Sequence, residues 1–251
     1  MEVHHHPHVE KKNFKEYFLE FLMIFLAVTL GFFAESYREH LVAKETEKQN
    51  IESLLNCLAS DTTQLERVIN ANIKVVSHLD SLVQMRNVDL SIAENKRNFL
   101  THAVVGFSED IYFNTNDAAL QQLKSSGTLR LIRQSVVDSI YKYELLNKTT
   151  VAQQSDSYWL FRIGFTDFKK AVDLFFYNDT SVMKYSFGYY YNDVQFKNID
   201  AISISKDKVN ILFGDAATMS GPLGAYIQLM EEELAYGKNL IAFLKNEYGL
   251  E

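Results

Sequence analysis

The hydrophobic pattern begins with an apolar run near the N-terminus. Fourteen consecutive residues, 21–34, carry no charge, and aromatic side chains flank them on both sides. A bilayer core of about 30 Å needs about 20 helical residues, and residues 17–37 reach that length by including Glu20 and Glu35 near the two ends. The pattern predicts a membrane anchor at 17–37, in contact with lipid, after a polar His-rich tail at 1–16.

Two other interpretations of this run stay open. Ala34-Glu35-Ser36 has the small-x-small form of a signal-peptide cleavage site, and an apolar run this short also occurs in buried helices of soluble proteins. Glu20 is a candidate interaction residue, because a carboxylate at membrane depth either reaches the headgroups or serves proton coupling and helix contacts.

The orientation of the anchor is only weakly encoded. Three basic residues precede it and three follow it: Lys11, Lys12 and Lys15, then Arg38, Lys44 and Lys48. Because the two sides carry equal numbers of basic residues, the positive-inside rule does not decide which side of the membrane the N-terminus lies on. The preceding lysines lie closer to the apolar run, which favours a cytoplasmic N-terminus and an extracytoplasmic body at 38–251.

A coiled-coil-like seam follows the anchor. Positions spaced 4-3-4-3 along one helix face are apolar in eight of ten cases: Ile51, Leu55, Leu58, Thr62, Leu65, Ile69, Asn72, Val76, Leu79 and Val83. The seam predicts either self-association through this helix or packing against later helices of the same chain. Leu65 and Asn72 are the candidate interaction residues of the seam. The polar seam positions Asn72 and Thr62 could fix register or partner number.

The rest of the body predicts long helices, because proline occurs only at positions 7 and 222. A Ser91/Glu94 capping box predicts the start of one helix, and Gly106 predicts its end. A short helix is predicted from about Asp117 to Gly127. Residues 135–175 predict one helix of about forty residues or two stacked ones, and Ser220-Gly221-Pro222 predicts the start of the last helix. The fold class is therefore all-α, an antiparallel long-helix bundle that continues from the anchor.

A tyrosine-rich segment at 178–221 is the least helical part of this pattern. Tyr189, Tyr190 and Tyr191 are candidate interaction residues, because dense tyrosines are typical of binding surfaces. The alternative is a loop that closes the end of the bundle. The same two interpretations apply to the aromatic loop that holds Tyr112 and Phe113.

Composition narrows the function classes. The chain has 251 residues and a net charge of −7, with no basic stripe, which argues against nucleic-acid binding. Cys57 is the only cysteine, so no disulfide framework forms within one chain. His78 and His102 stand alone on predicted helices, and no catalytic, cofactor or metal motif occurs. We therefore expect no enzyme activity, no cofactor and no metal site.

The N-terminal part also resembles a known group of sequences. HHHPHVEKKNFKEYFLEFLMIFLAVTLGFFAESYREH with EKQNIESLLNCLASD resembles an uncharacterised family of single-pass membrane proteins from Bacteroidota, and NDAALQQLKSSGTLRLIRQSVVDSIYKYE is similar to a recurring element of such proteins. The resemblance covers roughly residues 1–150. It implies a Gram-negative inner-membrane protein with a helical periplasmic body, and it implies no activity and no functional residues.

Three functions follow as expectations. The first is a membrane-anchored, non-enzymatic interaction or scaffold protein that forms homo-oligomers or binds another protein. The alternative is a periplasmic sensor or small-ligand-binding module that acts through a partner, with a pocket near Tyr112, Phe113 and the tyrosine-rich segment. The third is an ion-coupled membrane component that uses Glu20.

Overall fold

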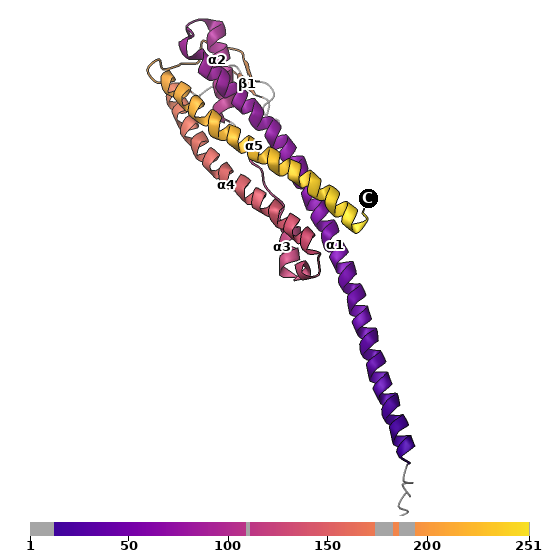
Figure 1. Ribbon diagram of the computed structural model, residues 1–251. Helices are drawn as coiled ribbons and strands as arrows, with labels where there is room; N and C mark the ends of the chain where they lie inside the picture. The colour runs from indigo at the N-terminus through magenta and orange to yellow at the C-terminus, as the bar shows by residue number, and fades with distance from the viewer. Residues whose placement is uncertain (1–12, 109–110, 174–182, 186–193, 251) are drawn as a thin grey trace, which may run out of the picture. The chain divides into compact units, whose positions relative to one another are not determined.

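The computed structural model describes residues 13–108, 111–173, 183–185 and 194–250 (Figure 1). The elements follow in the order α1 (Phe14–Gln84), η1 (Met85–Asn87), α2 (Ala93–Ser108), α3 (Ala118–Ser125), η2 (Thr128–Arg130), α4 (Gln134–Ala171), β1 (Met183–Tyr185), β2 (Val194–Phe196) and α5 (Val209–Tyr248). Helices dominate, as predicted. β1 and β2 pair antiparallel, with Met183 opposite Phe196.

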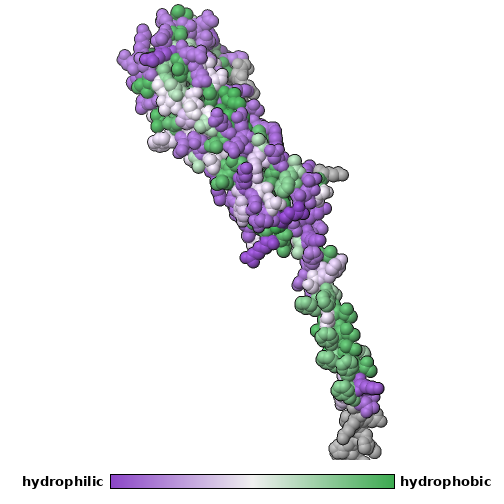
Figure 2. Space-filling view, viewed as in Figure 1, coloured by the Kyte–Doolittle hydropathy of each residue, from purple (hydrophilic) through white to green (hydrophobic). Residues whose placement is uncertain are grey.

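The chain divides into two units, residues 1–50 and 51–251, and α1 contributes to both. In the first unit the apolar side chains of α1 are exposed, and Figure 2 shows them as a continuous apolar surface. Of the helices in the described part of the chain, this one alone is long and apolar enough to cross a membrane.

The second unit is a bundle in which α5 runs antiparallel to α4 and to the second part of α1 (Figure 1). Low residue numbers on α1 and α4 meet high ones on α5: Glu66 with Lys238, Asp80 with Ser220, Arg133 with Glu247, and Gln154 with Tyr226. This arrangement confirms the predicted antiparallel bundle of long helices.

The seam of α1 lies inside this bundle. Leu65 is fully buried and Asn72 is 2% exposed. The Asn72 side-chain amide donates to the Val68 carbonyl at 2.9 Å and approaches the Ile111 carbonyl at 3.4 Å, so it is occupied within the chain. Of the two interpretations of the seam, intramolecular packing is the one observed, and neither candidate residue is available to a second molecule in this fold.

The bundle core consists of two apolar clusters. One lies around the second part of α1, α2 and the first part of α5, with Phe99, Phe107 and Tyr226 among its members. The other lies around α3 and includes Leu54, Leu123 and Leu244. Along each long helix, buried polar residues separate the two clusters: Asp61 and Thr62 on α1, Thr150 on α4 and Glu233 on α5. We call this set the polar layer.

Two predicted helix boundaries are wrong. α5 begins at Val209, so Pro222 lies in its interior and the irregular segment ends before Val209, not at residue 221. Leu212, Phe213 and Ala216 are buried there, and this packing outweighs the roughly 3 kcal/mol cost of an interior proline. Helix α2 continues past Gly106, which packs against Leu79.

The structure also bears on three local predictions, at the start of α2, the end of α3 and the length of α4. Just before α2, Asp89 Oδ1 accepts the Ser91 backbone N–H at 2.9 Å. Gly127 follows α3 and has a φ of 71°, which confirms the predicted left-handed termination of this helix. Helix α4 is a single helix of 38 residues, which confirms the longer of the two alternatives.

Candidate functional site

A buried aspartate joins three elements at the polar layer. Asp61 on α1 is 2% exposed, and its Oδ1 accepts the Asn116 backbone N–H at 2.9 Å. Its Oδ2 accepts the Thr115 hydroxyl at 3.1 Å and the Tyr143 hydroxyl at 3.4 Å. Through these contacts Thr115 and Asn116 hold the segment before α3 against α1. Burial raises the pKa of Asp61, whereas the three hydrogen bonds lower it, and burial has the larger effect.

A second buried carboxyl group lies in the same layer. Glu233 on α5 is fully buried, and its Oε1 accepts the Asn147 side-chain amide at 2.9 Å. No described group hydrogen-bonds its other oxygen, Oε2. Burial raises the pKa of Glu233, and the nearby charge of Asp61 acts in the same direction. Hydrogen bonds from Thr150 and Asn147 act against this shift of the pKa, and burial outweighs them.

Tyr143 lies between the two carboxyl groups. Burial and the charges of Asp61 and Glu233 raise the pKa of its hydroxyl, so the phenol stays protonated. A hydroxyl has one proton to donate, and Tyr143 directs it at Asp61. Each carboxyl group also has its own neutral donors, Thr115 and Asn116 for Asp61 and Asn147 for Glu233.

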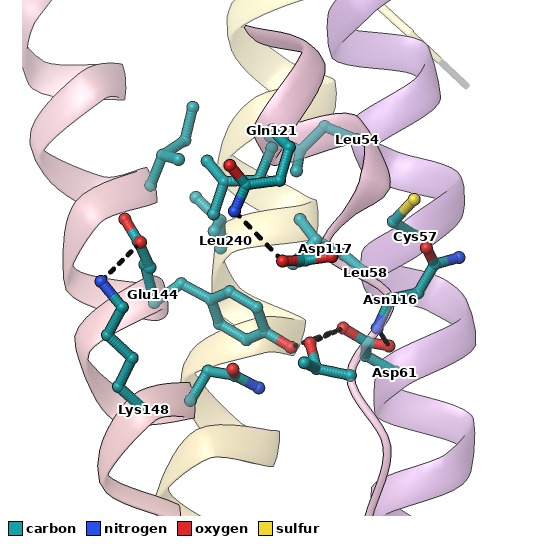
Figure 3. Close-up of a pocket in the computed structure, with 15 residues that line it drawn as sticks. Leu54, Cys57, Leu58, Asp61, Asn116, Asp117, Gln121, Glu144, Lys148 and Leu240 are labelled. Carbon is teal, nitrogen blue, oxygen red and sulfur yellow. Dashed lines mark hydrogen bonds and ion pairs between the residues drawn. The ribbon is translucent and has the colours of Figure 1, made fainter. Parts of the chain in front are cut away.

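A cavity of about 150 Å³ opens beside this group (Figure 3). Residues of α1, α3, α4 and α5 form its wall, and Leu54, Leu58 and Leu240 supply apolar surface. Asp61, Asp117 and Glu144 line it with carboxylates, and Cys57 contributes a half-buried thiol. The cavity therefore combines a small apolar volume with acidic groups.

The acidic groups of the cavity differ in their partners. Glu144 bonds Lys124 at 2.6 Å and Lys148 at 2.8 Å, and these two ammonium groups lower the pKa of Glu144. Asp117 accepts a hydrogen bond from a neutral group, the side-chain amide of Gln121, at 3.1 Å (Figure 3). Asp61 likewise has only neutral hydrogen-bond donors. The negative charge is thus least compensated on the α1 and α3 sides.

Two histidines that appeared isolated in the sequence meet in the structure. His78 on α1 and His102 on α2 bring their Nδ1 atoms to 3.0 Å, and both rings are half-buried. Burial lowers the pKa of both imidazoles, and the charge of His102 lowers that of His78 further. In the described part of the chain no three His, Cys, Asp or Glu side chains are grouped to hold a metal ion.

An apolar stripe runs along the outer face of α4. Its members are Tyr141, Leu145, Ala152, Trp159 and Ile163, all of them exposed. At 100° per residue they fall within about 40° of one another. Leu145 and Trp159 are each 64% exposed. We call these five residues the α4 stripe. From Leu145 to Ile163, Thr149 and Asp156 complete a 4-3-4-3 spacing.

The residues nominated from sequence do not form one site. Leu65 and Asn72 lie in the core, and Glu20 lies on the exposed first part of α1. Tyr189, Tyr190 and Tyr191 lie outside the described residues. Phe113 is buried and packs into the core, as a loop closing the bundle would, whereas Tyr112 lines a shallow surface hollow with Tyr158.

Sequence reasoning missed the polar layer, the cavity and the α4 stripe. Asp61 lay next to a seam position, and Glu233 lay inside an acidic run of three glutamates, where it resembled a solvated residue. The stripe had a detectable signal, because Leu145, Ala152 and Trp159 are spaced seven apart. Only the fold shows which apolar face of α4 is covered.

Comparison of the chain with protein-family models, with curated proteins and with solved structures finds no match in any of the three. The resemblance to membrane proteins of Bacteroidota therefore stays a prediction.

Proposed function

We propose that this protein is a membrane-anchored, non-enzymatic interaction protein that self-associates through the α4 stripe. The observation that carries the proposal is the exposure of five apolar side chains on one face of a 38-residue helix. Contiguous exposed apolar surface in a folded protein marks an interaction site more often than scattered single residues do. Trp159 and Tyr141 belong to the residue types that dominate binding energies at interfaces.

A second copy of this chain is the proposed partner. The 4-3-4-3 spacing of the stripe suits packing against another helix, and a twofold axis lets one stripe pack on its own copy. Anchoring at residues 17–37 confines copies to one membrane, which raises their effective concentration. We place the anchor in an inner membrane and the body in the periplasm, supported by the lysines that precede the apolar run.

Cross-linking in the membrane tests this proposal. Ala152 lies at the middle of the stripe, so two copies bring these positions closest whichever way the helices cross. In a Cys57→Ser background, Ala152→Cys is expected to form a disulfide-linked dimer under mild oxidation. Lys169→Cys, exposed on another face of α4, is the matched control. Equal cross-linking of both variants, or none at Ala152→Cys, would count against the stripe as the interface.

A ligand-binding module that acts through a partner is the second candidate. The cavity beside Asp61 favours it, since a small-molecule site is a concave apolar volume with a few directed polar groups. Its location differs from the pocket expected at Tyr112, Phe113 and the tyrosine-rich segment. The ion-coupled role of Glu20 remains a prediction without support from the contacts of the body.

A further inference from the structure

The cavity beside the polar layer has the size of a small organic molecule. An engineered apolar protein cavity of about 150 Å³ binds benzene, and this one has the same volume. Leu54, Leu58 and Leu240 give it apolar walls from two helices. A ligand of about eight non-hydrogen atoms with a compact apolar body therefore fits the space.

The charge of the lining selects among such ligands. Three carboxylates face the cavity, and Lys148 is the one cationic side chain among the lining residues. Lys148 already bonds Glu144, and its side chain is 68% exposed, so it does not compensate Asp61 or Asp117. A cation inside the cavity would balance the negative charge of Asp61 and Asp117. An anion would be repelled by these carboxylates.

Asp61 is the group that a cation would neutralise. It is buried and its three hydrogen-bond donors are neutral: a backbone N–H, a threonine hydroxyl and a phenol. A buried carboxylate held this way is costly unless a positive charge lies nearby. Because the described acids do not gather as a metal site, an organic cation and not a metal ion fits the cavity.

We propose that the cavity binds a small primary amine, with its ammonium group at Asp61 and its apolar body against the leucines of α1 and α5. This inference rests on the ligand-binding candidate and is independent of self-association through the α4 stripe. Cys57 lines the same cavity and is the only cysteine. It therefore reports occupancy without any engineered label.

The test compares three molecules of similar shape and different charge: benzylamine, benzyl alcohol and benzoate. Full-length protein in detergent at neutral pH is titrated with each one. Two quantities are measured, the thermal midpoint and the rate at which methyl methanethiosulfonate modifies Cys57. Benzylamine is expected to half-protect Cys57 at a concentration about tenfold lower than benzyl alcohol does, a factor equal to roughly 1.4 kcal/mol. Benzoate is expected to be the weakest of the three.

Variants assign the preference to the acidic lining. Asp61→Asn should reduce the advantage of benzylamine over benzyl alcohol to less than about threefold. Asp138→Asn, which removes an exposed charge from α4 outside the cavity, should leave the advantage unchanged. If Asp61→Asn does not fold, Asp117→Asn replaces it, with a smaller but measurable reduction expected.

The outcomes separate the ligand class from the site. Equal protection by all three molecules would keep a small-molecule cavity and overturn the amine proposal. Absence of protection by all three, with Cys57 reactive, would overturn both. Stabilisation by benzylamine that leaves the Cys57 rate unchanged would place binding elsewhere and would also overturn the proposal. None of these outcomes bears on the oligomeric state, which a mass measurement decides separately.

Discussion

At the scale of single residues, the polar layer is the least expected feature of the bundle. Asp61 and Glu233 of this layer, together with Tyr143, come from three helices and bring two buried carboxyl groups between the two apolar clusters. Buried carboxyl groups destabilise a fold unless they are hydrogen-bonded or neutral. Asp61 receives three hydrogen bonds, whereas Glu233 has one oxygen without a described donor.

The state of Glu233 predicts a stabilising substitution. Its folded pKa is raised by burial, so its contribution to stability is full below its usual pKa of about 4.5 and is lost as pH rises through the folded pKa. Glu233→Gln keeps the acceptor for Asn147 and removes the titration. We expect about 1 kcal/mol of added stability at pH 8, or about 2–4 °C in thermal midpoint.

Thermal scans from pH 4 to pH 8 check this expectation, and the gain should shrink toward pH 4. Glu232→Gln is the control, because that neighbour is exposed and should change little. A Glu233→Gln protein that is less stable than the parent at pH 8 would show that the charged carboxylate is required.

The histidine pair predicts a pH response of opposite sign. The pKa values of His78 and His102 are lowered in the folded state, so their contribution is present above the usual value of about 6.5 and is lost as pH falls below it. His102→Gln removes one partner and should flatten the loss of thermal midpoint between pH 7 and pH 5. His40→Gln, at an exposed position of α1, should not.

The residues of the site were beyond sequence reasoning for a physical reason. Asp61 and Glu233 are far apart in the chain, and each lies among residues that look amphipathic or solvated. Their raised pKa values arise from burial, which depends on how the helices pack. Likewise His78 and His102 lie on different helices, and only the α1–α2 packing makes them neighbours.

At the scale of elements, most helices follow from local signals. The scarcity of proline and the glycine after α3 predicted long helices and one sharp termination, and both are observed. Pro222 misled because proline normally marks a first helical turn. The buried side chains between Val209 and Met219 extend α5 on the N-terminal side of it.

Close packing of α4 predicts a destabilising substitution. A Cβ at Gly164 would lie 2.8 Å from Met219 Sδ and 2.8 Å from Phe107 Cδ1, closer than van der Waals contact. Gly164→Ala is expected to lower stability by about 1–3 kcal/mol, in spite of its better helix propensity. Gly224→Ala on α5, where nothing lies within 4 Å of the added Cβ, should instead stabilise by about 0.5–1 kcal/mol.

Thermal midpoints of the two alanine variants compare these effects directly. A Gly164→Ala protein as stable as the Gly224→Ala protein would mean that Phe107 and Met219 can move away at little cost.

The α1 seam and the α4 stripe show what helix periodicity can and cannot predict. The α1 seam and the α4 stripe from Leu145 onward have the same 4-3-4-3 spacing, yet one is buried within the chain and the other is exposed. The pattern identifies an apolar face and says nothing about what covers it. The predicted self-association therefore moves from Leu65 and Asn72 to Leu145 and Trp159.

At the scale of the whole molecule, an apolar helix precedes a bundle whose described residues leave the α4 stripe uncovered, and both features support the proposal of a membrane-held protein that self-associates. The exposed apolar side chains at 17–37 would be costly in water and are favourable in lipid. Self-association would cover Trp159 and its neighbours in the same way.

The molar mass of the full-length protein in detergent tests this account most directly. We predict a dimer or higher oligomer for the parent chain and a monomer for the double variant Leu145→Glu/Trp159→Glu. Each of the single variants Leu145→Glu and Trp159→Glu should shift the mass toward the monomer, whereas Ile73→Glu, which adds one glutamate at an exposed position of α1, should keep the parent mass. A monomeric parent protein, or a double variant as oligomeric as the parent, would contradict self-association through the α4 stripe.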